Sequence, residues 1–335
     1  MHRKNMMRVS ALAMVPALGL TACGGEDASD DPDATVLTLA HSYNPGQPQV
    51  DCGIDLIEER VNEADAGIAI ETYGSSQLGG DADRIASVSS GDIDIDIQGA
   101  SALGAVYEPV SVFDAAYAFD DEQHLADFMA DSASDQVIED FEAETGIHTL
   151  GAWSAGARHF TADSPIRDPQ DLDGLRIRFP GSPQYLMNAR ALGAEATEVA
   201  YEEIYLSLQQ GAVDGQENPI NIIESENLAE VQDYLSLSAH QLNTNLVIIG
   251  EVWEELDSDQ QEVLSSAVEE AVDEVTACVA EEEETTLQDW ETSGEIEVVD
   301  DVDIDAFSDQ ARQYLEENLE GDSLEVFESI RGSAG

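Results

Sequence analysis

The chain has 335 residues, and its 12 basic and 72 acidic side chains give a formal net charge of −60. Nucleic acid is not expected as a partner, because phosphate binding requires a basic surface. Repulsion among so many carboxylates opposes a compact state unless salt screens it, and at molar salt the Debye length falls to roughly 3 Å. The composition therefore indicates a halophilic surface. An acidic disordered chain is the alternative, but 42% hydrophobic residues in periodic segments argue against it.

The N-terminus has the pattern of an export signal. A basic stretch, "MHRKNMMR", precedes an apolar run over residues 9–20 that is too short for a mature membrane-spanning helix, and "LTAC" follows at once. We interpret residues 1–22 as a signal peptide and Cys23 as a lipidated cysteine; an unlipidated membrane anchor is the alternative. Residues 23–34 then form the lipidated end and a flexible linker. The mature protein is expected outside the cytoplasm, anchored by lipid to the outer face of the cytoplasmic membrane, in the periplasm or at the cell surface.

Strand and helix patterns alternate in the first part of the mature chain. Residues 35–42 and 68–74 read as strands, and residues 49–67 have apolar side chains at helical spacing. The strict alternation of "DIDIDIQG", residues 92–99, predicts a further strand. The chain is therefore of the α/β class.

The pattern continues in the second part. Residues 174–180 predict a strand, and helices are expected over 182–193 and 202–211, each closed by a glycine. The polar, glycine-containing segment "AVDGQENP", residues 212–219, predicts a turn-rich connection.

A much longer helix is predicted to start at a capping box formed by Ser258 and Gln261 and to run to Gly294. At 1.5 Å per residue, about 35 residues would extend roughly 50 Å, more than the width of one domain. The economical architecture is two α/β domains with a cleft between them and this helix across both. The expected lobes are approximately 35–155 plus 246–285, and approximately 156–245 plus part of the C-terminal region.

Two cysteines remain once Cys23 is assigned to lipid. Cys52 and Cys278 would lie in an oxidising compartment, where a disulfide is plausible. Two separate buried thiols are the alternative, because the sequence does not supply the Cα separation that a bridge requires. No cysteine or histidine spacing resembles a zinc site.

Arginine is concentrated in one segment. Nine arginines and no lysine remain after the signal peptide, and four of the nine lie between Arg158 and Arg178. A guanidinium pairs with both oxygens of a carboxylate, and such a contact in a closed cleft is screened little by salt. We expect Arg178 to contact a ligand, whereas a structural salt bridge is the expected role of Arg167 and Arg176. Both roles stay open for Arg158.

The chain resembles the substrate-binding proteins of TRAP (tripartite ATP-independent periplasmic) transporters, the DctP-like family. The resemblance rests on "LAHSYNPGQP", "SSQLGGDADRIASVSSGDID", "LRIRFPGSP" and, in register after it, "LQQGAVDGQENP". It covers nearly the whole mature chain. It implies two α/β domains of the periplasmic-binding-protein type that close over a small carboxylate, no cofactor, no catalysis, and delivery of the ligand to a TRAP-type permease.

The family's ligand-binding residues transfer one at a time. The arginine that pairs with the ligand carboxylate corresponds to Arg178, and the asparagine of the "DGQENP" segment corresponds to Asn218. A second arginine near the ligand corresponds to Arg158. His41 lies in the first loop that the family places along its cleft. The chain departs from common members at Phe179, which affects the part of the pocket that selects the ligand.

Two further hypotheses concern side chains of the same region. The rings of Trp153 and Phe179 are candidates to stack on the apolar body of a ligand, with core packing as the alternative. "AWSAG" around Ser154 is close to a nucleophile-elbow pattern, with His159 and His240 as conceivable bases. A secreted, lipid-anchored serine hydrolase is therefore the alternative function.

Overall fold

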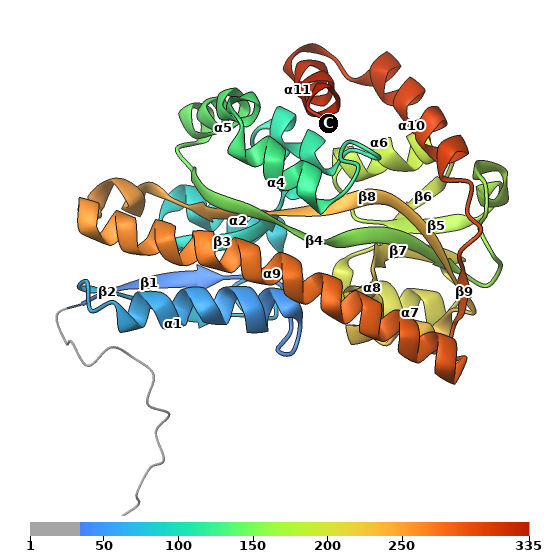
Figure 1. Cartoon of the computed structure of the whole chain (residues 1–335), viewed down its shortest axis with the longest axis horizontal. Helices are drawn as coiled ribbons and strands as arrows, with labels where there is room; N and C mark the ends of the chain where they lie inside the picture. Colours follow the sequence, from blue (N-terminus) through green and yellow to red (C-terminus); the bar gives the residue numbers. More distant parts are fainter. Residues whose placement is uncertain (1–33, 335) are drawn as a thin grey trace, which may run out of the picture.

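A mixed β-sheet with helices on both faces organises the residues that the computed structural model describes, 34–334 (Figure 1). Eight strands follow the order β2-β1-β3-β8-β4-β7-β5-β6, and β9 pairs with β8 outside this path. The strands are β1 (Thr35–Ala40), β2 (Ile68–Tyr73), β3 (Ile95–Gly99), β4 (His148–Ala162), β5 (Arg176–Phe179), β6 (Glu195–Glu198), β7 (Gly215–Pro219), β8 (Tyr234–Ile249) and β9 (Glu297–Val299). The α/β class is confirmed.

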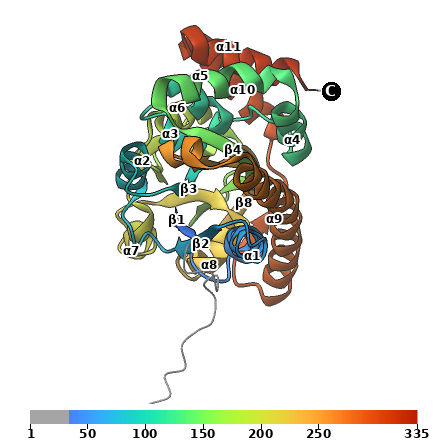
Figure 2. The ribbon, with the colours of Figure 1, turned by 90° about the vertical axis from the view of Figure 1, so that its left-hand side faces the viewer.

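Helices form two layers around this sheet (Figures 1 and 2). One layer contains α2 (Asp81–Ser90), α3 (Ala100–Leu103), α4 (Glu122–Ala130), α5 (Ser132–Thr145), α6 (Pro183–Leu192), α10 (Ile304–Asn318) and α11 (Gly321–Gly332), which share one continuous hydrophobic core. The other contains α1 (Asp55–Glu63), α7 (Ile204–Gln209), α8 (Ile220–Ser225) and α9 (Ser258–Ser293), which cover two separate cores. The sheet is thus shielded on both faces, as parallel strands require.

The long strands β4 and β8 join the two halves of the sheet. On one side of this pair lie β3, β1 and β2, and on the other lie β7, β5 and β6. The β4–β8 register shifts between Ser154 and Ala157, and Gly156 in this bulge has φ +102°, a conformation that favours glycine. The irregularity lies where one half of the sheet passes into the other.

The predicted long helix is present as α9, which crosses the face of the molecule diagonally (Figure 1). It packs against the core of α1 through Val268 and Val275, and against the core of α7 and α8 through Trp290. The capping box differs from the predicted one: Asp257, not Ser258, is the N-cap, and its partner is Gln260. The predicted end at Gly294 is confirmed, in a left-handed conformation.

The predicted turn-rich connection over residues 212–219 was wrong for its second half. Gly215–Pro219 is strand β7, and all five residues are buried. The polar side chains that suggested a turn bond to buried partners instead: Gln216 Nε2 donates to Thr161 Oγ1 at 3.0 Å, and Glu217 pairs with Arg158. A strand whose polar groups are satisfied by tertiary contacts shows no apolar pattern in the sequence.

Two smaller outcomes concern the first helix and the cysteines. The helical segment after residue 48 begins with a π-helical turn, Gln49–Ile54, before α1. Cys52 in this turn forms a disulfide with Cys278 of α9, which confirms the bridged alternative. Within residues 34–334 no helix combines the length and hydropathy of a membrane span. The predicted signal peptide and Cys23 lie outside the described residues.

Candidate functional site

Strand pairing brings three of the predicted site residues together. β7 lies between β4 and β5: it pairs antiparallel with β4, which sets His159 opposite Asn218, and parallel with β5, which sets Arg178 beside Gln216. Arg158, one residue before His159, is therefore close to the same strand. All three side chains, those of Arg158, Arg178 and Asn218, are buried.

Arg158 is bound by the protein itself. Its guanidinium pairs with both carboxylate oxygens of Glu217, and Nη2 also contacts Asn218 Oδ1 at 3.0 Å. Tyr185 lies under the guanidinium, with the ring centroid 4.9 Å from Cζ. Burial lowers the pKa of Arg158, but the Glu217 carboxylate more than offsets this, and the net shift is upward. The charge of Arg158 is thus neutralised within the site.

Arg178 is buried without a carboxylate partner among the described residues. Its Nε donates to the Val199 carbonyl at 2.9 Å, and none of the ion pairs includes it. Burial lowers the pKa of Arg178 to about 10, with Glu217 and Arg158 acting in opposite directions, so the guanidinium stays charged at neutral pH. A buried charge without a counterion costs stability, and an anionic ligand would remove that cost.

Arg176 and Arg178 are two residues apart on β5, but their environments differ. Arg176 is exposed and forms a bidentate pair with Asp214, at 2.8 and 2.6 Å. The predicted salt bridges of Arg176 and Arg167 are confirmed, the latter with Asp301 at 2.8 Å. Only the second arginine of the "RIRF" strand is directed into the interior.

His41 follows β1 directly and is buried on the other side of the site. Burial, and then the Arg84 charge, lower the pKa of His41 to about 4, so its imidazole is neutral at physiological pH. Its Nδ1 is buried and has no hydrogen-bond partner within residues 34–334. A ligand contact of His41 stays a prediction.

The two aromatic candidates are fully buried in hydrophobic cores. Phe179 belongs to the core beneath α6 and α10, and Trp153 to the core beneath α9. The Trp153 ring lies close to Gly53 of the π-helical turn, although its indole Nε1 has no hydrogen-bond partner in the described part of the chain. Packing accounts for the burial of both rings, and stacking on a ligand stays a prediction for each.

Several polar residues of the site were not recognised in the sequence. Asn243 and Asn245 of β8 are the clearest examples. Asn243 Oδ1 accepts from Arg158 Nη1 at 2.8 Å and from Tyr185 Oη at 3.0 Å, and Asn245 Oδ1 accepts from Tyr43 Oη. The signal that could have revealed them is "NTN" inside the otherwise apolar strand "QLNTNLVIIG".

Hydrogen bonds also join the two halves of the molecule near this site. Gln47 Nε2 donates to Ser225 Oγ at 2.7 Å, and Asn44 Nδ2 donates to Glu226 Oε1 at 3.1 Å. Tyr201 Oη donates to the same Glu226 oxygen at 2.8 Å. The loop after β1 is thereby bonded to the C-terminal end of α8 and to the residue that follows it.

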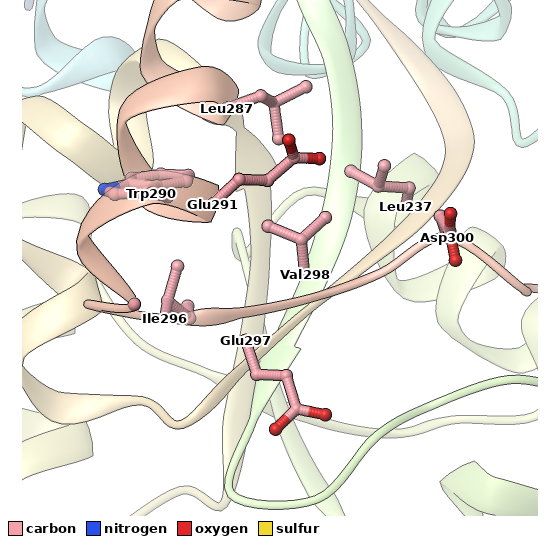
Figure 3. Close-up of a pocket in the computed structure, with 9 residues that line it drawn as sticks. Leu237, Leu287, Trp290, Glu291, Ile296, Glu297, Val298 and Asp300 are labelled. Carbon is pink, nitrogen blue, oxygen red and sulfur yellow. The ribbon is translucent and has the colours of Figure 1, made fainter.

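A separate surface pocket does not fit an organic anion. This hollow of about 430 Å³ lies between the C-terminal end of α9 and β9 (Figure 3). The side chains that line it include the apolar Leu237, Trp290 and Val298 and the acidic Glu291 and Glu297. No arginine lines it. Among the described residues, the lining of this pocket therefore offers no cation that could pair with a carboxylate.

The fold and the buried polar site together define a class of protein, a two-lobed receptor that binds a small solute between its lobes. The family described as bacterial extracellular solute-binding protein, family 7 (DctP) matches residues 39–322, and the chain belongs to this family. The expectation of a DctP-like TRAP receptor is confirmed, as is its extracytoplasmic location.

Individual relatives match this chain over most of its length but at low sequence identity. The 2,3-diketo-L-gulonate-binding periplasmic protein of Escherichia coli is 29% identical over 257 residues, 76% of this chain and 77% of that protein. The sialic acid-binding periplasmic protein of Vibrio cholerae is 28% identical over 262 residues, 78% of this chain and 82% of that protein. An uncharacterised protein of Sinorhizobium fredii is 27% identical over 283 residues, 84% of this chain but 52% of that protein.

A solved structure agrees with the fold. The TRAP periplasmic solute-binding protein of Roseobacter denitrificans with bound L-galactonate superposes with a TM-score of 0.81 at 27% identity, covering 89% of this chain and 99% of that one. The predicted two-domain architecture is therefore confirmed.

The serine hydrolase alternative is not supported. The family consists of solute receptors, and Ser154 is buried, with its Oγ accepting from the Gly156 amide at 3.1 Å. His159 Nδ1 accepts from the Ala239 amide at 3.0 Å, and His240 lies beside Glu217. Neither histidine bonds to Ser154 within the described chain, so a nucleophile and its base are not paired.

Proposed function

We propose that this receptor captures a small organic acid outside the cytoplasm, with Arg178 pairing to the ligand carboxylate, and delivers it to a TRAP-type permease. The observation that carries the proposal is the buried guanidinium of Arg178, which has no acidic partner in the described chain. Relatives that are named for diketogulonate and sialic acid, and the neighbour with bound galactonate, support a carboxylate ligand.

The proposed mechanism is capture by closure, with no chemistry on the ligand. Two lobes, approximately 35–155 plus 246–285 and approximately 156–245 plus part of the C-terminal region, would separate to admit the anion. The bulge near Gly156 is the middle one of three register shifts between β4 and β8, and the lobes would move about it. Once Arg178 is paired, the bonds of Gln47 and Asn44 to the other half stabilise the closed state.

The carboxylate anchor is tested by calorimetry at fixed molar salt, with the best ligand from a thermal-shift panel of succinate, pantoate, D-erythronate and L-galactonate. Arg178→Ala leaves a desolvated carboxylate unpaired, which costs roughly 3–5 kcal/mol, so binding should weaken by about a hundredfold or more. Arg178→Lys keeps the charge without the planar fork and should recover only part of the affinity.

Arg176→Ala is the matched control for this experiment. It removes a guanidinium from the same strand, but one that is exposed and already paired with Asp214. It should alter stability more than affinity. If Arg178→Ala binds within about threefold of the wild type, the anchor is assigned to the wrong residue.

We also propose that Cys23 carries the lipid that holds the receptor at the membrane. The proposal rests on the sequence pattern of residues 1–23. Cys23→Ser should release the protein into the soluble fraction, and wild-type protein should sediment with membranes. An unmodified mature N-terminus in mass spectrometry of the wild type would contradict lipidation.

A further inference from the structure

Most of the buried positive charge near this site is already neutralised by acidic side chains of the protein. Within residues 34–334, three arginines are buried: Arg84, Arg158 and Arg178. Arg158 is paired with the buried carboxylate of Glu217. Arg84 is paired with Asp96 at 3.0 Å and with Asp81 at 3.1 Å, so of these three arginines only Arg178 has no carboxylate partner among the described residues.

The Arg84 pair faces the same site from the opposite half of the sheet. Asp96 is level with Ala40 in the β1–β3 register, and His41 follows Ala40 directly. After burial, the Arg84 charge is the next cause that lowers the pKa of His41. Tyr43 donates a hydrogen bond to Asn245, and burial raises its pKa, while the charges of Asp81 and Arg158 shift that pKa in opposite directions. We therefore interpret the Arg84–Asp96 pair and the Arg158–Glu217 pair as lying on either side of the polar region that contains Tyr43 and Asn245.

The remaining groups of this region suit an uncharged polar partner. Asn243 and Asn245 use their side-chain oxygens within the protein, while their amide nitrogens donate to no described residue. Amide nitrogens of this kind donate to hydroxyl or carbonyl oxygens. A second ligand carboxylate would instead lie near Glu217 and Asp114, two fully buried acids. It would be repelled by them, and no unpaired cation among the described residues of this region would neutralise it.

We infer that the ligand carries a single carboxylate and an uncharged, hydroxylated remainder, and that Asp96 excludes diacids by neutralising Arg84. This inference rests on the proposed function, because Arg178 must be the carboxylate anchor. It distinguishes hydroxylated monocarboxylates from the four-carbon dicarboxylates that the same fold accommodates in other proteins, such as the Shewanella oneidensis receptor with bound succinate.

Two ligand pairs test the inference on the wild-type receptor. D-erythronate and meso-tartrate differ only in the oxidation state of the terminal carbon, and so do L-galactonate and galactarate. Calorimetry at molar salt should show the hydroxy acid binding about tenfold or more tightly than its diacid partner, because an unpaired buried carboxylate is penalised. Equal affinities, or a preference for the diacid, would overturn the inference.

A variant tests the role of Asp96. Asp96→Asn leaves Arg84 with only Asp81, whose side chain is 58% exposed. The affinity of the diacid relative to the hydroxy acid should rise by about tenfold, since Arg84 then has charge to offer. Asp214→Asn, which frees the exposed Arg176, is the control and should leave this ratio unchanged. If Asp96→Asn does not fold, Asp81→Asn should shift the ratio in the same direction; an unchanged ratio in the folded variants would contradict the role.

Arg178→Ala separates this inference from the proposed function. If the alanine variant binds both members of a pair as the wild type does, the carboxylate anchor fails and the inference fails with it. If the variant loses both ligands while the wild type prefers the diacid, the anchor is correct and only the inference about ligand charge is wrong.

Discussion

Arginine is used sparingly in the described chain, and each position shows a physical reason. Six of nine arginines form ion pairs: Arg60, Arg84, Arg158, Arg167, Arg176 and Arg331. Arg190 and Arg312 are exposed, where water solvates the charge. Among the arginines that the structure describes, only Arg178 is both buried and without a carboxylate partner. At this scale the proposed site has one unneutralised charge and not a cluster of positive residues.

Glu283 is a second residue with an unusual environment. It lies on α9 against the β4 bulge, where a Cβ at Gly156 would collide with its carboxylate. Its Oε1 is buried and has no hydrogen-bond partner among the described residues. Burial, and then the charge of Glu122, raise the pKa of Glu283 to about 8, against a hydrogen bond with the Ile220 backbone. The carboxyl group is therefore mostly protonated at neutral pH.

We predict a pH-dependent effect of Glu283→Gln on stability. A carboxyl whose folded pKa is raised stabilises the protein below its unfolded pKa of about 4.3, and that stabilisation is lost as pH rises towards 8. The wild type should lose up to about 1.4 kcal/mol per pH unit relative to the variant over this window. Thermal unfolding across the window measures it, with exposed Glu284→Gln as the control. A stability difference between wild type and variant that does not change with pH would contradict the assignment.

At the scale of elements, the two halves are held together by parts that belong to both. β4 and β8 run through the whole centre of the sheet, and α9 packs on the cores of both halves. The Cys52–Cys278 disulfide ties α9 to the π-helical turn before α1, across 226 residues of sequence. The bridge fixes α9 to the half of the molecule that contains α1. If the other half moves, it would therefore move relative to α9 and α1 together.

Removal of the disulfide should destabilise the receptor without changing its affinity for the ligand. We expect the Cys52→Ser/Cys278→Ser variant to lose about 2–4 kcal/mol in free energy of unfolding, because the unfolded chain gains conformational freedom. Chemical denaturation at fixed salt measures the loss, and reduced wild-type protein is the control, which should match the variant. Equal stability of variant and oxidised wild type would show that the bridge contributes nothing.

At the scale of the whole molecule, negative charge dominates. The formal net charge is −60, and the chain beyond the predicted signal peptide contains only nine arginines and no lysine. Acidic side chains therefore repel one another over the entire surface, and most have no cationic neighbour to pair with. Dissolved salt is the only source of screening on this scale.

Folding should consequently depend on salt. We expect the melting temperature to fall steeply, and the fold to be lost, as the salt concentration drops below about 0.5 M, where carboxylate repulsion is less screened. Melting curves in KCl measure this, and sucrose is the control, since it is excluded from the surface but does not screen charge. A melting temperature that is independent of KCl would contradict the halophilic interpretation.

The sequence by itself determined the local features of this protein. Periodicity predicted the α/β class and most strands and helices, and glycines marked the ends of α6 and α9, because both signals arise within a few consecutive residues. The scarcity of arginine marked the segment of the site, and motifs in register indicated the family that the comparisons confirm.

Only the tertiary structure decided which groups neutralise one another. Arg158 and Glu217 are 59 residues apart, and Arg176 and Asp214 are 38 apart, so no local pattern shows that both arginines are paired while Arg178 is not. The same holds for β7, whose polar residues resembled a turn until their buried partners on β4 were in place. Polar groups become compatible with a buried strand through contacts distant in sequence, and such contacts exist only in the folded chain.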